Sequence, residues 1–527
     1  MSSPSPARSP PPSGSPTATP FIRGLLLTAC FLAQAIDSYN GAAFFIAIPP
    51  ISFQLGIDSD TSVWLISAYQ LTFASFLLGS GRLADLFGPK YVFIGGLLVM
   101  SFTSLGAGFT RSEVPLILLR AIQGIGAAMN LPSAIALIIR LCPDQPGQAR
   151  ALAIFSTISG IGGIVGLFIG AAFVVDASWP WVLYFTTIYT FAVAALVFVC
   201  APSHLAQPAP TGSLDGAPRT VVGLKRVDII GIFLLTSALI LFIFAVTSES
   251  ATGWGSARVI APLVISIVLA AVFALWEHWV DELNAVVPPS MWRYKNFSVL
   301  VGLALLPIMW WAAVQFLFSW VWQQDYGYSS IKTALHILPL LLVCFVAGPA
   351  TDILQKRVPL KKVILLGQSL LITGNILLPF GSAPNKFWRF VVPGMIIASS
   401  GNLFILATAN VALFHDFPAS KAGTAAAVFS CANQLGSATG SAIVATIQAN
   451  VGSSATDFSG TAASLWFLLA INAVAAVAVF ISMDYVPATE AGTKPAAKGQ
   501  HPTEEMSKSA INEDPEKIMV DSEDRSV

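Results

Sequence analysis

The stretch "GSGRLADLFGPK", from Gly79 to Lys90, separates two apolar runs that are each long enough to cross a lipid bilayer. It holds three glycines, two basic residues, one acid and one proline in twelve residues. Gly81 and Gly88 permit tight backbone turning, and Pro89 can begin a helix because its missing N–H would be unpaired at that position. We therefore expect a short, sharply turned connection between two helices.

The composition excludes most soluble classes of protein. Of the 527 residues, 55% are hydrophobic and 10% are charged, whereas an average soluble domain carries about 25% charged residues. The 27 basic and 27 acidic residues balance, so the net charge indicates no nucleic-acid partner. The five cysteines lack metal-ligand spacing, and no phosphate-binding or dinucleotide-binding glycine motif occurs. We therefore expect a lipid environment, no metal and no cofactor.

Apolar runs of about 20 residues, the length needed to cross a bilayer, recur along the chain. Only helices satisfy their own backbone in lipid without closing into a barrel, and the alternation of barrel strands is absent. The predicted fold class is an all-α integral membrane protein with about fourteen transmembrane helices. Their runs begin near Gly24, Ser62, Tyr91, Val114, Ala149, Trp181, Val227, Val259, Phe297, Ile331, Val363, Phe387, Gly423 and Ala462.

Basic residues are distributed unevenly between alternate loops, and this bias sets the orientation. With a cytoplasmic N terminus, the outer side holds only Arg111, Arg258, Lys386 and Arg389, with Lys332 just inside a span. The inner side holds Arg82, Lys90, Arg140, Arg150, Arg219, Lys225, Arg226, Arg293, Lys295, Lys356, Arg357, Lys361, Lys362 and Lys421. We therefore expect both termini in the cytoplasm. The expected location is the plasma membrane, with a vacuolar or other internal membrane as the alternative.

A weak internal repeat indicates two related halves. Gly81-x-x-x-Asp85 and Gly348-Pro-Ala-Thr-Asp352 are each followed by basic residues. Two related halves around a site in mid-membrane are the architecture of secondary transporters. The expected domains are a disordered cytoplasmic tail at 1–20, a six-helix bundle at 21–200, a cytoplasmic loop at 201–226, two additional transmembrane helices at 227–280, a second six-helix bundle at 281–485 and a disordered cytoplasmic tail at 486–527.

The opening stretch resembles a signature of the major facilitator superfamily, which lies between the second and third helices of that family. The matching residues are Gly81, Leu83, Asp85, Gly88 and Lys90. A second stretch, "LILLRAIQGIGAA" at 116–128, is similar to the fourth-helix motif of the family. It has Arg120, Gln123, Gly124 and Gly126 in place.

Two further stretches narrow the resemblance. "GGIVGLFIGA" at 162–171 is similar to the fifth-helix motif typical of antiporters, although Leu167 replaces its proline and Ala171 its last glycine. "DSYNGAAFFIAIPPI", which follows Ile36, resembles the first helix of fungal fourteen-span drug:proton antiporters of the aminotriazole-resistance type. The resemblance covers Gly24 to about Tyr485 and implies transport by alternating access.

The resemblance also implies a role for the opening stretch. In the family, the acid of this loop lies against the start of a late helix, which begins here near Gly423. A helix N terminus carries about half a positive charge and therefore stabilises a carboxylate. We name Gly81, Asp85, Gly88 and Lys90 the cytoplasmic latch and expect it to favour one of two arrangements of the halves. The alternative is an ordinary turn of an inner loop.

Deep charged residues are the strongest candidates for a functional role. Asp37 in the first run and Arg120 in the fourth are essentially the only ionisable residues far from the end of a run. A charge at the centre of a membrane helix costs about 2.5 to 3.5 kcal/mol, so it should face a cavity or a partner. We expect Asp37 and Arg120 to couple transport to protons, with a purely structural ion pair as the alternative.

Polar and aromatic residues elsewhere are candidates for a substrate cavity. Gln34 and Asn40 share a helix face with Asp37, and two mid-span tryptophans suit a partly apolar ligand. For most of these residues a hydrogen bond in helix packing is the alternative. The predicted cavity residues are Gln34, Asn40, Gln123, Trp310, Trp311, Gln315, His336 and Asn433.

Small residues predict close helix packing. Gly162, Gly166 and Gly170 lie on the fifth run, and Gly436 and Gly440 lie on the thirteenth. We expect these two helices, one from each half, to be where the two bundles rock against each other.

Three classes of function remain open. The leading one is a proton-coupled exporter of a small organic compound, such as a drug, a toxicant or a secondary metabolite. The second is an importer or facilitator of a small ion or metabolite. The third is a membrane-embedded enzyme, but the sequence offers no histidine cluster, paired deep carboxylates or nucleophile motif. The expected partners are a small-molecule substrate, protons and lipid, with the chain acting as a monomer and not as an enzyme.

Overall fold

Helices make up the described part of the chain. The computed structural model describes residues 20–57, 59–142, 144–202, 205, 207, 228–281, 285–415, 422–451 and 458–488. Within these ranges the secondary structure consists of α-helices with short 3₁₀ and π segments, and no strand occurs. Most of the two predicted tails and most of the predicted loop at 201–226 lie outside these ranges.

The helices follow one another with short connections. The first group is α1 (Pro20–Leu55), α2 (Ser59–Ser62), α3 (Trp64–Phe87), α4 (Pro89–Phe109), α5 (Glu113–Leu141), α6 (Gln145–Ala172) and α7 (Pro180–Cys200). The second group is the pair α9 (Ile229–Thr252) and α10 (Ala257–Trp279). The third group is α11 (Phe297–Trp320), α12 (Ser330–Leu342), α13 (Cys344–Arg357), α14 (Leu360–Leu377), α15 (Val392–His415), α16 (Ala422–Val451) and α17 (Ser459–Ser482). Short segments η1 (Phe173–Ala177), η3 (Pro289–Arg293), η4 (Val321–Asp325), η5 (Leu378–Phe380), η6 (Pro384–Lys386) and η7 (Phe387–Val391) precede or follow these helices.

Twelve helical segments of the described ranges are long and apolar enough to cross a membrane. The chain is therefore an all-α, multi-pass membrane protein. The two other predicted spans coincide with α3 and α16, which are helical over 24 and 30 residues. Neither helix is apolar enough to be counted with the twelve segments. α3 contains Arg82 and Asp85, and α16 is rich in small and polar residues. The count of fourteen spans is therefore not confirmed.

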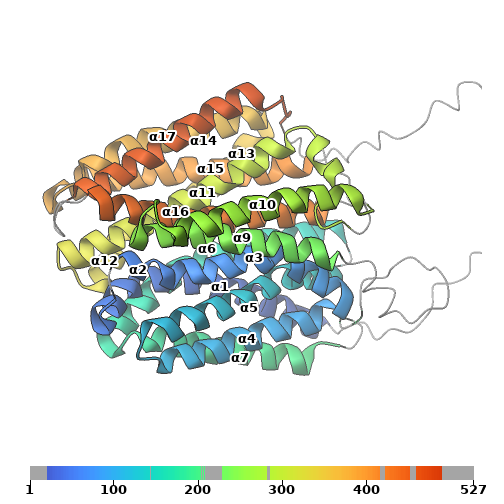
Figure 1. Cartoon of the computed structure of the whole chain (residues 1–527). Helices are drawn as coiled ribbons and strands as arrows, with labels where there is room; N and C mark the ends of the chain where they lie inside the picture. The colour runs from blue at the N-terminus through green and yellow to red at the C-terminus, as the bar shows by residue number, and fades with distance from the viewer. Residues whose placement is uncertain are drawn as a thin grey trace, which may run out of the picture. The chain divides into compact units, whose positions relative to one another are not determined.

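The same packing pattern occurs twice along the chain. In the first group α1 packs on α6, α4 on α5, and α4 on α7. In the third group α11 packs on α16, α14 on α15, and α14 on α17. In Figure 1 the first group is blue to teal and the third is yellow to red, with the green helices α9 and α10 between them. We call the first and third groups the N-terminal and C-terminal halves.

Fewer elements join the two halves. α3 packs against α16, α6 packs against α12, and α9 contacts both α3 and α16. At the end where α1 finishes, Gln323 and Gln324 of η4 donate to the carbonyl oxygens of Ile46 at 3.2 Å and Pro49 at 3.4 Å. These hydrogen bonds join the two halves at that end.

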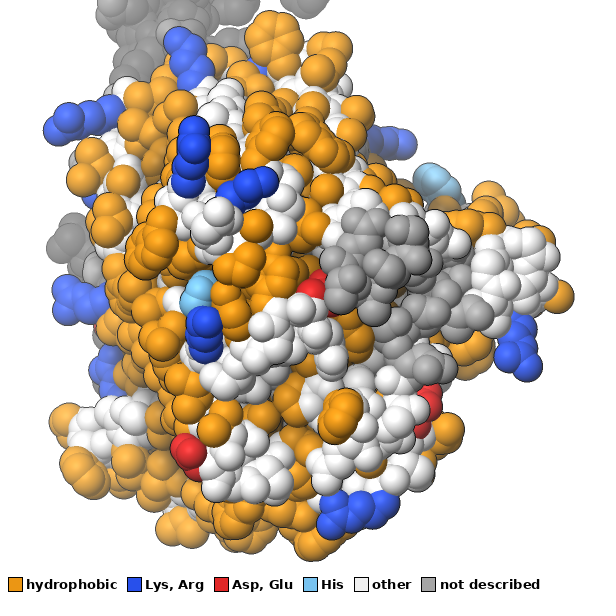
Figure 2. Space-filling model, turned by 90° about the vertical axis from the view of Figure 1, so that its left-hand side faces the viewer, with side chains coloured by type: hydrophobic (Ala, Val, Ile, Leu, Met, Phe, Trp, Pro, Cys, Tyr) orange, Lys and Arg blue, Asp and Glu red, His pale blue; other side chains and the backbone are white. Residues whose placement is uncertain are grey.

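The end at which α2 and α12 lie faces the viewer in Figure 2. Basic and acidic side chains stand singly among apolar and uncharged polar ones on the described part of this face. The visible surface therefore carries no concentrated charge of the kind that binds a nucleic acid.

The predicted turn at Gly79–Lys90 is shorter than we expected. α3 continues to Phe87, and Gly88 alone breaks the helix, with a φ of 86° that favours glycine. Pro89 begins α4 at once, as predicted. Gly81 lies inside α3, where an added Cβ would come no closer than 3.9 Å to Pro132, so the prediction that Gly81 helps the turn is wrong.

The glycines of α6 and α16 bring backbones together within each half. A Cβ added at Gly162 or Gly166 would lie 2.5 Å from Ala35 O or 2.6 Å from Tyr39 O of α1, and Gly170 faces Ala43. In the same way Gly436 and Gly440 face Leu305 and Met309 of α11. Close packing is as predicted, but these glycines do not face the opposite half. The expectation that they form the surface where the halves rock is therefore wrong.

We expect Gly166→Ala to destabilise the protein, because the new methyl group overlaps the backbone of Tyr39. Overpacking of this kind costs about 1 to 3 kcal/mol. The measurement is the melting temperature of the purified protein in detergent. Gly163→Ala is the control, because nothing lies within 4 Å of a Cβ at that position of the same helix. Equal melting temperatures for the two variants would contradict the packing argument.

Candidate functional site

Arg120 of α5 is the most deeply enclosed charged side chain of the described chain, with 1% of its surface exposed. Its Nε donates to Leu65 O of α3 at 3.1 Å. Its Nη1 donates to Asn40 Oδ1 of α1 at 3.3 Å and to Gln123 Oε1 of α5 at 2.6 Å. Three helices therefore meet at one guanidinium group.

Aromatic rings complete this enclosure. The guanidinium carbon of Arg120 lies 3.9 Å from the ring centre of Phe44 and 4.5 Å from that of Tyr69. Cation–π contacts of this kind reach about 2 kcal/mol when the cation is desolvated. Gln123 extends the hydrogen-bond network to α4, because its Nε2 donates to Ser104 Oγ at 2.6 Å. Neutral hydrogen-bond acceptors and aromatic rings thus offset much of the cost of burying the charge of Arg120.

Asp37 of α1 reaches this network through a tyrosine. The hydroxyl group of Tyr69 donates to Asp37 Oδ1, while the ring of Tyr69 stacks on Arg120. In the described chain no ion pair joins Asp37 directly to Arg120, although their charges interact. The two predicted residues therefore lie in one cluster, with Tyr69 as the bridge between them.

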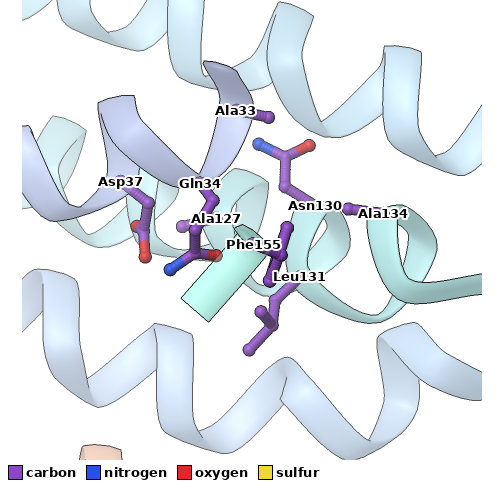
Figure 3. A pocket seen from close by; sticks show the side chains of 8 residues that line it. All are labelled: Ala33, Gln34, Asp37, Ala127, Asn130, Leu131, Ala134 and Phe155. Atoms are coloured by element: carbon purple, nitrogen blue, oxygen red, sulfur yellow. The ribbon is translucent and has the colours of Figure 1, made fainter. Parts of the chain in front are cut away.

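A pocket lies beside Asp37, between α1, α5 and α6 (Figure 3). Asp37, Gln34 and Asn130 supply its polar groups. Its remaining lining is apolar and consists of Ala33, Ala127, Leu131, Ala134 and Phe155. The pocket has room for about one water molecule, so in this conformation its acid and two amides can serve a water or a proton but cannot enclose an organic substrate.

The predicted cavity residues of α11 lie in the C-terminal half, apart from this pocket. Trp310 is fully buried, and its Nε1 donates to Asn375 Oδ1 of α14 at 2.7 Å. Trp311 is half-buried and meets the ring of Phe45 of α1 edge-on, with 6.5 Å between ring centres. Gln315 is fully buried, and neither atom of its amide group has a hydrogen-bond partner.

The two remaining cavity candidates lie elsewhere. His336 of α12 is half-buried among the rings of Trp322, Tyr328 and Phe387, and its Nδ1 lies 2.7 Å from Lys332 O. Asn433 of α16 is half-buried, and its Oδ1 has no partner. Neither residue lines the pocket beside Asp37.

The latch residues make different contacts where α3 ends and α4 begins. Asp85 is exposed at the end of α3 and interacts with the charges of Arg82 and Arg140. Lys90 is buried, and its Nζ donates to Ala201 O, the residue that caps α7. Residues 416–421 and the surroundings of Gly423 lie outside the described part, so the contact of Asp85 with the start of α16 stays a prediction.

Tyr69, Ser104 and Asn130 of this cluster and pocket were not predicted from the sequence. A tyrosine within an apolar run is usually a packing residue, and serine often bonds within its own helix, so neither pattern gives a strong signal. Asn130 lies ten residues after Arg120 on the same helix, and it could have been found as a second polar residue of that run.

We expect Arg120→Lys to destabilise the protein by about 1 to 3 kcal/mol, since an ammonium group cannot serve all the Arg120 partners or stack between the rings. The melting temperature in detergent is the measurement. Arg140→Lys is the control, because Arg140 lies at the exposed end of the same helix and donates to Gln207 O. Equal melting temperatures for Arg120→Lys and Arg140→Lys would refute this role of the Arg120 guanidinium group.

The chain is 28% identical over 431 residues to the puromycin resistance protein pur8 of Streptomyces alboniger, which covers 80% of this chain and 81% of that protein. It is 24% identical over 481 residues to the efflux pump terJ of Aspergillus terreus, which covers 89% of this chain and 90% of that protein.

A solved structure is also similar. The crystal structure of a POT family transporter in complex with a thioalcohol-conjugated peptide superposes with a TM-score of 0.64 at 16% identity, over 87% of this chain and 95% of that chain. At this identity the likeness concerns the fold. The sequence profile of the Major Facilitator Superfamily matches residues 30–441. The chain therefore belongs to the major facilitator superfamily, whose members are transporters rather than enzymes.

Proposed function

We propose that this transporter is a proton-coupled exporter of a small organic compound that works by alternating access. The observation that carries the proposal is the position of Asp37. It lies beside a pocket and is joined through Tyr69 to a buried arginine. An acid in an apolar surrounding favours its protonated form, whereas a nearby cation favours its ionised form. A proton-coupled carrier needs its acid protonated at one stage of the cycle and ionised at another. A change in the distance between helices moves Asp37 between these two conditions.

The relatives support export rather than uptake. The similar proteins of Streptomyces alboniger and Aspergillus terreus are named for puromycin resistance and for efflux. We assign this chain to the fungal fourteen-span antiporter branch on its first-helix stretch. The substrate is accordingly a drug, a toxicant or a secondary metabolite.

The proposed architecture has two bundles of six helices with α9 and α10 as an inserted pair. In this reading α3 and α16 also cross the membrane, because their partners on either side do so. The excess of basic residues in alternate loops supports two cytoplasmic termini. We propose that the protein acts as a monomer in the plasma membrane.

A second candidate is a facilitator or importer. The observation in its favour is Leu167, which is fully buried in an unbroken α6 where antiporters of the family typically have a proline. An unbroken helix gives no local bend for an antiport-specific movement. The direction of transport in a defined system separates the two candidates.

We expect Asp37→Asn to abolish accumulation driven by a pH gradient while leaving downhill exchange, because an amide cannot carry a proton through the cycle. The measurement is uptake of labelled puromycin and other amphipathic compounds into proteoliposomes, with and without a pH gradient. Arg120→Ala should impair both modes. Asn450→Asp, at an exposed position near the end of α16, is the control for a simple change of charge.

If Asp37→Asn still concentrates a substrate against its gradient, the proton site lies elsewhere, and His336 is the next candidate. If the unmodified protein takes up substrate equally well with the pH gradient reversed or absent, the chain is a facilitator.

We expect Asp85→Asn to shift the protein toward the conformation that is open to the cytoplasm, because the amide loses its attraction to the start of α16. Cys344, which faces Gly160 of α6 across the two halves, is the reporter when it is the only cysteine left. Its rate of labelling by a maleimide should rise. Asp281→Asn is the control, and equal rates for the two variants would argue against the latch.

A further inference from the structure

Helix α3 connects the Asp37 cluster with the C-terminal half. Tyr69 contacts Asp37 and Arg120, whereas the next residue, Gln70, donates from Nε2 to Ser437 Oγ of α16 at 2.6 Å. One turn further along α3, Ala74 O accepts from Cys431 Sγ of α16 at 3.3 Å. One helix therefore carries the bond to the acid and two bonds to the opposite half.

Around Tyr69, α3 is joined to α5 by hydrogen bonds and by close backbone packing. Thr72 Oγ1 donates to Ala121 O at 2.6 Å, and Arg120 Nε holds Leu65 O at 3.1 Å. Gly124 lies directly against the backbone of Tyr69, and no Cβ would fit there. α3 and α5 therefore move together.

The attachment of α1 to this pair depends on charge. It includes the hydroxyl bond from Tyr69 to Asp37 and the longer bond from Arg120 to Asn40. A hydrogen bond to an ionised carboxylate changes an equilibrium constant by a factor roughly tenfold larger than a hydrogen bond to a neutral group does. Tyr69 and Arg120 are the ionisable groups that act on Asp37 in the described chain. The state of Asp37 therefore decides how firmly α1 holds α3.

We propose that Tyr69 is a positioning residue that transmits the charge of Asp37 through α3 to the contact between α3 and α16. This proposal rests on the proposed function, in which Asp37 binds and releases a proton. With Asp37 ionised, the Tyr69 bond favours the conformation described above, in which Gln70 holds Ser437. Proton uptake weakens that bond, and α3 then separates from α16.

Cys431 offers a native reporter of this contact, because it is buried between α16 and α3. The test uses the full chain in proteoliposomes, with Cys431 kept and every other cysteine replaced by alanine, and with N-ethylmaleimide at a single pH. We expect Asp37→Asn, which imitates the protonated acid, to raise the labelling rate roughly three- to tenfold. In the Tyr69→Phe background the same substitution should leave the rate unchanged, because the hydroxyl group it acts through is missing.

Tyr39→Phe is the matched control. Tyr39 is also a buried tyrosine, and its hydroxyl donates to Val182 O at 3.3 Å, away from Asp37. In that background Asp37→Asn should keep its full effect. A labelling rate that does not respond to Asp37→Asn, or one that responds by the same factor in the Tyr69→Phe background, overturns the proposal.

A second variant tests the proposal even if Tyr69→Phe folds poorly. Gln70→Leu removes the bond to Ser437 and leaves the side chains of Asp37 and Tyr69 unchanged, so it should raise the labelling of Cys431 to a level that Asp37→Asn does not raise further. An additive effect of the two substitutions also overturns the proposal. Labelling needs no substrate, so a failed transport assay and a failed coupling test remain distinguishable.

Discussion

A guanidinium group enclosed by membrane helices is the charge around which the N-terminal half is arranged. Burying a charge at mid-membrane costs about 2.5 to 3.5 kcal/mol unless partners compensate it. For Arg120 those partners come from α1, α3 and α5, and Gln123 extends the network to α4. Four helices therefore share one hydrogen-bond network that is centred on Arg120.

The described part of the C-terminal half repeats the packing of the N-terminal half without its deep charges. Where α11 meets α14, the buried contact is a neutral pair between Trp310 and Asn375. Asn402 of α15 donates to Pro307 O of α11 at 3.0 Å, which is again a neutral bond. Neutral amides do not change with proton uptake. A change in protonation therefore acts first on the N-terminal half and reaches the other half through the contacts between them.

Much of the fold could be predicted from the sequence, because lipid allows few alternatives to apolar helices. Predicted starts such as Phe297 and Gly423 fall at or within one residue of observed helix starts. The site could be predicted only in part. Asp37 and Arg120 stood out because charges are rare in membrane helices, but Tyr69 did not, since its role arises from the register of α1 against α3. Gly81 was misread because a glycine in sequence does not reveal whether the helix continues through it.

The difference between contacts within and between the halves explains how the molecule can move. Within a half, glycines such as Gly166 and Gly440 bring backbones so close that sliding would cause overlap. Between the halves, α3 and α16 are joined by side-chain hydrogen bonds, each worth about 0.5 to 1.5 kcal/mol. Each glycine-packed pair of helices should consequently move as one unit, and the boundary at α3 and α16 should open first. A change in charge worth only one or two such bonds is enough to shift that equilibrium.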